Sequence, residues 1–112
     1  MKDELQPVVR QVVELLVTKR YYELEAVTGG VRLSAAEIQA GIEEYGQRLV
    51  GPPEEAYGLM HAVRVVVAEH ETWFVSMPLW TEEEGRSDLA VEMTVIFQDE
   101  ATRIELDGIL VP

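Results

Sequence analysis

The chain contains 112 residues, of which 21 are acidic and 9 are lysine or arginine, so its formal net charge is −12 at pH 7. This length predicts one domain, spanning residues 1–112, with a single core. The hydrophobic content of 47% excludes a disordered acidic tail, because enough apolar surface is present to offset chain entropy. The negative charge argues against a direct nucleic-acid contact or an anionic membrane surface, since both would repel the chain.

The chain has no cysteine, which excludes disulfides, thiolate nucleophiles and cysteine-ligated zinc. No stretch approaches the roughly 20 apolar residues of a membrane-spanning helix. The N-terminus also lacks the basic region and uninterrupted apolar stretch of a signal peptide. We therefore expect a cytoplasmic protein with no membrane segment.

Residues 1–50 predict a helical region. Apolar residues recur at helical spacing from Leu5 to Leu16, which indicates a first amphipathic helix. A short second helix is expected at about Tyr21–Val27. It ends at Gly29-Gly30, because glycine readily adopts the left-handed conformation in which helices end.

The third helix has the strongest local signal. Ser34 and Glu37 have the spacing of a capping box, in which each side chain bonds the backbone amide of the other residue. Gly46 offers a stop, and the glycine and prolines at 51–53 end the helical region. The sequence leaves open whether residues 54–59 form another helical turn.

The second half, residues 60–111, predicts strands. Runs of alternating residues are separated by short polar segments, and they lie at Met60–Ala68, Trp73–Thr81, Leu89–Phe97 and Arg103–Val111. The connections are of hairpin length, so the simplest sheet is a four-stranded antiparallel meander. The predicted fold class is therefore α+β, with N-terminal helices packed on a C-terminal sheet.

Alternation assigns the strand residues to two faces. The face expected against the helices carries Trp73, Val75, Met77, Leu79, Leu89, Val91, Met93, Val95, Phe97, Ile104, Leu106 and Leu110. The opposite face mixes charged residues with large apolar ones, namely Phe74, Trp80, Ile96 and Ile109. A solvated face would be more uniformly polar.

Three interpretations of that mixed face remain open. Twist and loops cover the apolar residues, or the face binds a second copy or a protein partner, or it contributes to a ligand pocket. The interface candidates are Phe74, Trp80, Ile96 and Ile109. Residues 51–112 carry 3 basic and 13 acidic side chains, a net charge of −10, which either steers a basic partner or only keeps the domain in solution.

The sequence supplies no catalytic motif, metal site or cofactor motif. Glu69-His70-Glu71 is expected in an exposed turn, and His61 and His70 fall on opposite faces of a strictly alternating strand. Two histidines cannot form a three-histidine zinc site within one chain. The acidic segment 82–88 lacks the ligand order of an EF-hand loop, so we expect a solvated hairpin there.

The order of three helices before an antiparallel sheet resembles a reduced NTF2-like or cystatin-like fold. That resemblance implies a pocket between the helices and the sheet. The residues expected to line the pocket are Tyr45, Trp73 and Met93, with His61 or Asp107 as proton-transfer groups. Because the resemblance rests on element order alone, it carries no reaction with it.

Four segments are similar to small bacterial domains of unknown function, and these are Leu24–Gly30, Leu33–Glu37, Tyr45-Gly46 and Asp88–Val95. The leading hypothesis is a small non-catalytic binding protein, either a homodimer or the partner of a basic protein. Its concrete form is an acidic immunity- or inhibitor-type protein. The alternative is an NTF2-like protein or enzyme with a small ligand.

Overall fold

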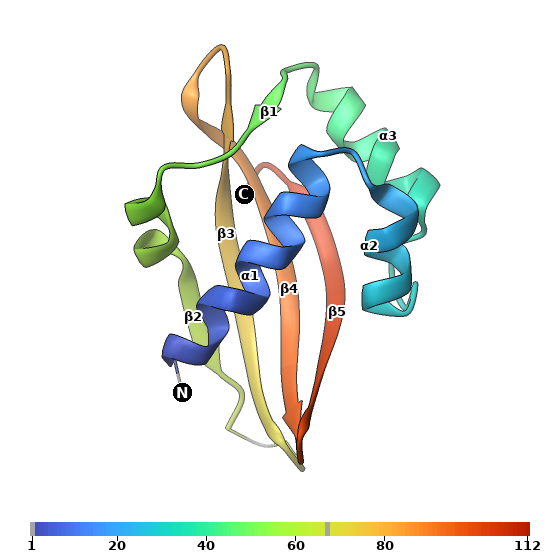
Figure 1. Cartoon of the computed structure of the whole chain (residues 1–112), viewed down its shortest axis with the longest axis vertical. Helices are drawn as coiled ribbons and strands as arrows, with labels where there is room; N and C mark the ends of the chain where they lie inside the picture. Colours follow the sequence, from blue (N-terminus) through green and yellow to red (C-terminus); the bar gives the residue numbers. More distant parts are fainter. Residues whose placement is uncertain (1, 67) are drawn as a thin grey trace.

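Helices and one antiparallel sheet form two layers in the computed structural model, which describes residues 2–66 and 68–112, with side chains from residue 4 onward (Figure 1). In chain order the elements are α1 (Lys2–Val17), α2 (Tyr21–Thr28), α3 (Ala35–Tyr45), β1 (Leu49–Val50), the 3-10 helix η1 (Glu54–Leu59), β2 (His61–Arg64), β3 (Glu71–Thr81), β4 (Gly85–Gln98) and β5 (Ala101–Leu110). The predicted α+β fold is therefore confirmed, and the curled sheet is consistent with an NTF2-like half-barrel.

The core lies between α1 and the inner face of the sheet, which is the face toward the helices. α1 crosses β3 and β4 in Figure 1, and water does not reach Leu5, Val9 or Val12 on its apolar stripe. These residues belong to one cluster with the inward strand residues Val75, Met77, Leu79, Leu89, Val91, Met93, Val95, Ile104 and Leu106. Because each large aliphatic side chain contributes about 1.5–3 kcal/mol when buried, this contact is the main source of stability.

α1 ends in a Schellman motif. Lys19 takes the left-handed conformation, with φ of 60°. The amide of Lys19 donates to the carbonyl of Leu16 at 3.1 Å, and the amide of Arg20 donates to that of Leu15 at 2.9 Å. Carbonyls at the end of α1 thus find donors, and the chain reverses into α2.

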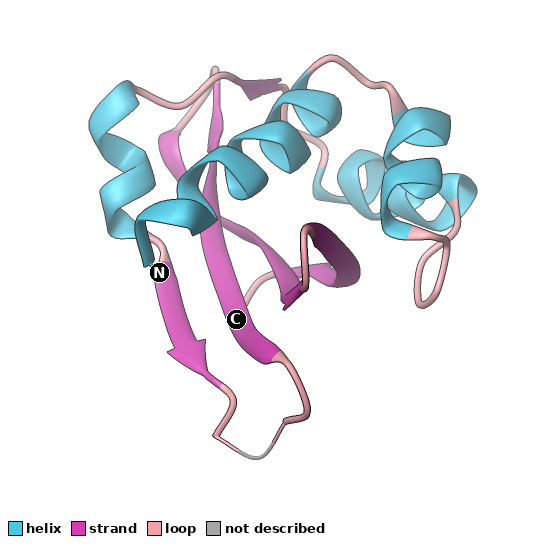
Figure 2. Ribbon diagram, turned by 60° about the horizontal axis from the view of Figure 1, so that its bottom comes forward, coloured by secondary structure: helices cyan, strands magenta, loops and turns pink. Residues whose placement is uncertain are grey.

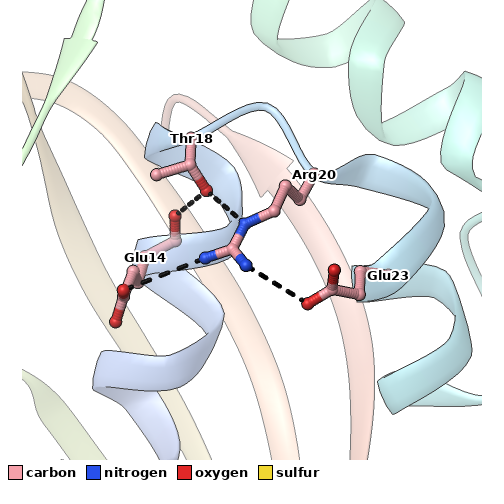
Figure 3. Close-up of polar contacts among 4 residues, drawn as sticks. All are labelled: Glu14, Thr18, Arg20 and Glu23. Atoms are coloured by element: carbon pink, nitrogen blue, oxygen red, sulfur yellow. Dashed lines mark hydrogen bonds and ion pairs between the residues drawn. The ribbon is translucent and has the colours of Figure 1, made fainter.

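The Arg20 side chain folds over this turn (Figure 3). Its Nε donates to the Thr18 hydroxyl at 2.9 Å, and that hydroxyl donates to the Glu14 carbonyl at 2.7 Å. The guanidinium also lies 3.9 Å from the Glu14 carboxylate and 3.5 Å from that of Glu23. Exposed ion pairs contribute about 1 kcal/mol or less, so this group supports the turn between the helices.

The predicted ends of α2 and α3 are confirmed. Gly29 follows α2 with φ of 72°. The capping box before α3 is complete, because the Ser34 hydroxyl accepts from the amide of Glu37 at 3.2 Å, and the Glu37 carboxylate accepts from the amide of Ser34 at 3.0 Å. Gly46 ends α3 with φ of 81°.

β3 organises the sheet. It pairs with β4 along one side and with β1 and β2 along the other, while β4 also pairs with β5. The predicted meander is thus present as β2–β5, although β2 is shorter than the expected strand and Val67 within that range lies outside the described residues. β1 was not predicted, because two residues are too short to show alternation, and residues 54–59 form η1.

A bulge in β5 corrects the predicted face of Ile109. Glu92 of β4 pairs with Gly108, but the next residue, Met93, pairs with Leu106. Asp107 is therefore an extra residue, and an extra residue reverses the side-chain alternation that follows it. Ile109 packs against the core cluster, whereas Leu110, which was expected on the inner face, is 37% exposed.

A second irregularity lies where β3 and β4 pair near their turn. The register shifts between Pro78 and Trp80. The buried Ser87 hydroxyl donates to the Leu79 carbonyl at 2.8 Å and accepts from the Leu89 amide at 3.1 Å. The serine thus satisfies backbone groups that the irregular ladder would leave unpaired.

Ile109 and Leu110 are neighbours in β5, but the bulge turns Ile109 toward the core and Leu110 toward solvent, so alanine substitutions at the two positions can be compared. We expect Ile109→Ala to lower the free energy of unfolding by about 2 kcal/mol, because it removes core packing. Leu110→Ala is expected to cost about 0.5 kcal/mol. Urea unfolding of both variants measures the difference, and a larger loss for Leu110→Ala would show that β5 alternates without the bulge.

Candidate functional site

The space between α1 and the sheet is filled by side chains. Met93, expected to line a pocket there, has no exposed surface and lies in the core cluster with Val75 and Leu106. The apolar stripe of α1 occupies the space that Met93 was expected to line. Every buried side-chain nitrogen or oxygen in the described residues has a hydrogen-bond partner.

The other pocket candidates lie on separate elements. His61 is exposed on β2 and pairs with Ser76 of β3. Trp73 of β3 is part-buried, and its Nε1 donates to the Glu71 carboxylate at 2.9 Å. Asp107 stands at the bulge of β5. Tyr45 lines a hollow of about 290 Å³ between α3 and the strands β4 and β5, whereas His61 lines a different hollow near the C-terminus.

Tyr45, at the end of α3, joins the helical layer to the β3–β4 turn. Its hydroxyl donates to the Glu84 carboxylate at 2.9 Å and accepts from the amide of Asp88 at 3.3 Å. Thr81 also donates to Glu84, at 3.1 Å. Partial burial, first, and the bond to Glu84, second, raise the pKa of the Tyr45 phenol above its ordinary value.

The neighbouring glutamates of the turn are held as well. The Glu83 carboxylate accepts from the amide of Arg48 at 3.0 Å, and Glu82 pairs with the Arg48 guanidinium at 3.2 Å. The segment 82–84, expected to be a solvated hairpin, is thus tied to the segment between α3 and β1. Sequence reasoning missed this contact because its partners lie more than 30 residues apart, as with Arg48 and Glu83 at a separation of 35.

The outer face of the sheet, which points away from the helices, is the least covered part of the fold. The helices gather on the opposite side in Figure 2. One region of the outer face, the apolar patch, consists of Val63, Val65, Phe74 and Ile96. Val63 pairs with Phe74 across β2 and β3, and Ile96 is a diagonal neighbour of Phe74 on β4. Val63 is 48% exposed.

A second region, the acidic patch, lies toward β5 and consists of Glu92, Glu105 and Asp107. The Thr94 hydroxyl donates to the Asp107 carboxylate at 2.7 Å. Arg32 approaches from the α2–α3 connection, with its Nε 2.8 Å from Asp107. The side chains of Glu105 and Asp107 are only 13% and 18% exposed, so their charges are less screened than those at the surface.

A third region is an open hollow of about 570 Å³ at the end of the outer face near the C-terminus. His61, Arg86 and Asp88 line it together with apolar residues of β3, β4 and the C-terminus. In the described part of the chain, Arg86 and Asp88 form no ion pair with each other or with a third group. The hollow therefore shows no paired acid and base.

The four interface candidates divide between different positions. Phe74 and Ile96 lie in the apolar patch. Trp80 lies near the end of β3, where it pairs with Val50 of β1 and packs partly against the core. Ile109 is turned inward by the bulge. Alternation found the first two because β3 and β4 are regular there.

The described side chains form no metal cluster. Across residues 4–66 and 68–112, no three His, Asp or Glu side chains are grouped closely enough to hold a metal ion. Within the same ranges, no helix has the length and apolar character that crossing a bilayer requires.

Comparison with known proteins places this chain in a family. Residues 13–112 match the model of a domain of unknown function, DUF7668. No curated protein and no solved structure gives a significant match. The chain belongs to the DUF7668 family.

The contact between Tyr45 and the β3–β4 turn predicts a pH dependence. The raised pKa favours the neutral phenol in the folded state, so this stabilisation is complete below the ordinary tyrosine pKa of about 10 and is lost as pH rises through the raised value. We expect Tyr45→Phe to unfold more easily than the natural chain at neutral pH. The gap between their free energies of unfolding should narrow in alkali, and a gap that widened would contradict the assignment.

Metal removal tests the sequence prediction of no metal site. We expect a strong chelator to leave the Tm unchanged within about 1 °C, because a structural metal would contribute directly to folding. Thermal melts with and without chelator measure this. A large fall in Tm that one particular ion restores would contradict the prediction.

Proposed function

We propose that this member of the DUF7668 family is a non-catalytic protein-binding domain that contacts its partner through the outer face of its sheet. The observation that carries the proposal is the apolar patch of Val63, Val65, Phe74 and Ile96 beside the acidic patch. The helices lie on the opposite side of the sheet (Figure 2). Apolar anchors next to charged residues are typical of protein interfaces.

The partner we propose is a protein with a basic surface around apolar side chains. Residues 51–112, which form most of the sheet, carry a net charge of −10. Glu105 and Asp107 are largely buried, and they are ordered by Arg103 at 2.9 Å and Arg32 at 2.8 Å, respectively, so they lose little side-chain entropy on binding. The field of the net charge of the sheet would raise the rate of encounter with a cationic surface.

The concrete form of this proposal is a cytoplasmic bacterial protein of immunity or inhibitor type that covers a basic surface on a toxin or nuclease. It would not bind nucleic acid itself. A homodimer formed by stacking two outer faces receives less support, because Ile109 no longer contributes and the acidic patches would approach each other.

A small ligand remains the alternative proposal, and a different hollow favours it. A space of about 450 Å³ lies among the ends of α1 and α3, β1 and the β3–β4 turn, lined by Lys19, Tyr21, Gln47, Arg48 and Glu83 among others. This hollow is open and lies outside the helix–sheet seam. Small molecules that bound there would raise the Tm, and Phe74→Glu would leave that shift intact.

Recovery of a partner from an extract of the native cells tests the main proposal. We compare the natural chain with Phe74→Glu, which places a charge in the apolar patch. Tyr22→Glu is the matched control, because Tyr22 lies on α2 and is 84% exposed. We expect a basic protein to be retained by the natural chain and the control, with binding at least about tenfold weaker for Phe74→Glu.

The same experiment contains the outcomes that count against the proposal. Equal retention by all three chains would place the contact elsewhere, and retention lost equally in both variants would reflect added negative charge alone. Thermal melts of both variants exclude unfolding as the cause. Binding should also weaken as salt is added, because the contact is electrostatic in part.

A further inference from the structure

The two edges of the sheet are finished differently. At the β5 edge, α3 comes close, since a side-chain carbon on Gly41 would lie 3.9 Å from the Ile109 carbonyl oxygen. Arg32 also reaches β5, where it pairs with Asp107 and Glu105. β2 instead has β3 on one side, and Figure 2 shows it as an outermost strand. The β2 edge is therefore the more open edge of the sheet.

The directions of the backbone amides and carbonyls along β2 determine which kind of chain can pair with this edge. The amide of Val65 donates to the Thr72 carbonyl of β3 at 2.9 Å. Because backbone groups alternate in direction along a strand, Val63 and Val65 direct their amides and carbonyls toward β3. Those of Ala62 and Arg64 therefore point outward, away from β3. Only an extended chain satisfies such a row of alternating donors and acceptors.

The β2 edge carries only part of the usual protection of an exposed strand. Natural edges carry proline, lysine, inward charges or bulges that prevent pairing. β2 contains no proline, lysine or bulge, its one charged residue is Arg64 on the inner face, and it pairs with β3 in uninterrupted register. The valines of the segment His61–Val66 are exposed, with Val66 at 91%.

We propose that two copies of this chain pair antiparallel along their β2 edges and form one continuous sheet. The inference goes beyond the proposed function, because it concerns a second copy and the edge of the sheet. The outward backbone amides and carbonyls of Ala62 and Arg64 limit the registers in which the two β2 strands can pair. In the register centred on Val63, Ala62 faces Arg64 of the second copy, and each such pair exchanges two hydrogen bonds. Centring on Arg64 would instead place two like charges opposite each other, which is unfavourable.

Symmetry favours a second copy over other strands, and the acidic patches do not prevent the pairing. β5, which carries much of the acidic patch, is the far strand of the sheet, so pairing at β2 keeps the two patches roughly 30 Å apart along the joined sheet. That separation exceeds the screening length of about 8 Å at physiological salt. Because the contact is two-fold symmetric and uses the more open edge, it closes at a dimer. The apolar patches of the two copies meet across the axis through Val63.

Proline at position 64 tests the edge directly. Arg64→Pro removes an outward amide but no hydrogen bond to β3, and proline is tolerated on an edge strand in this orientation. Arg64→Ala is the matched control, since it removes the charge and keeps the amide. We expect sedimentation equilibrium to show a dimer for the natural chain and for Arg64→Ala. Arg64→Pro should raise the dimer dissociation constant by about 30-fold or more, because two copies each lose a hydrogen bond.

Hydrogen exchange gives a second readout that does not depend on the proline variant folding. The amides of Ala62 and Arg64 should become protected as the concentration of the natural chain rises, while the amide of Val63 is protected throughout. A monomer at about 100 μM in 0.5 M salt would overturn the proposal. A dimer whose dissociation constant is unchanged in Arg64→Pro would also overturn it. The same holds if the chain is a monomer and its Arg64 amide is protected from hydrogen exchange only when a different protein is added.

Salt dependence separates this proposal from the proposed function. Two chains of charge −12 repel each other, so the dimer should tighten as salt is added, whereas binding of a basic partner should weaken. Phe74→Glu should lose the partner and keep the dimer, because Phe74 lies one strand away from the edge. Arg64→Pro should do the reverse, so either proposal can fail without the other.

Discussion

The packing of α1 against β3 and β4 is the contact on which the remaining structure depends. Two layers of secondary structure need one shared apolar seam, and here the stripe of α1 supplies one side of it. The seam is closed to water at Val9 and Met93. Because α1 fills the concave side of the sheet, the position beneath α1, where the resemblance in element order predicted a ligand pocket, is part of the core. Surfaces outside the seam therefore carry the interactions we propose.

The irregularities of the strands determine which residues face those surfaces. A single extra residue, Asp107, turns Ile109 toward the core and Leu110 toward solvent. The bulge also brings the Asp107 carboxylate close to Thr94 and Arg32, so that the extra residue becomes part of the acidic patch. At the other end of the sheet, Ser87 satisfies the irregular ladder between β3 and β4. The two irregularities thus stabilise the sheet and shape its outer face.

The charges of this chain are divided between structural and unpaired roles. Tyr45 and Arg48 hold Glu82–Glu84 in place, so that this acidic turn is ordered by contacts with the α3–β1 segment. Glu92 has no ion-pair partner among the described residues and lies on the outer face beside Glu105 and Asp107. An acidic surface of this kind favours a basic partner. It also sets the condition for self-association, which is that the joined edges lie far from β5.

Local signals in the sequence determined the helices, their ends and the sheet meander. The capping box at Ser34, the glycines after α2 and α3, and regular alternation in β3 and β4 act over a few residues, so they can be recognised without the fold. The tertiary structure decided the contacts made at long range. It placed β1 beside Trp80, tied Tyr45 to Glu84 and buried Met93 beneath α1. It also decided the face of Ile109, because a bulge depends on how two strands pair, and one displaced residue reverses every assignment that follows it.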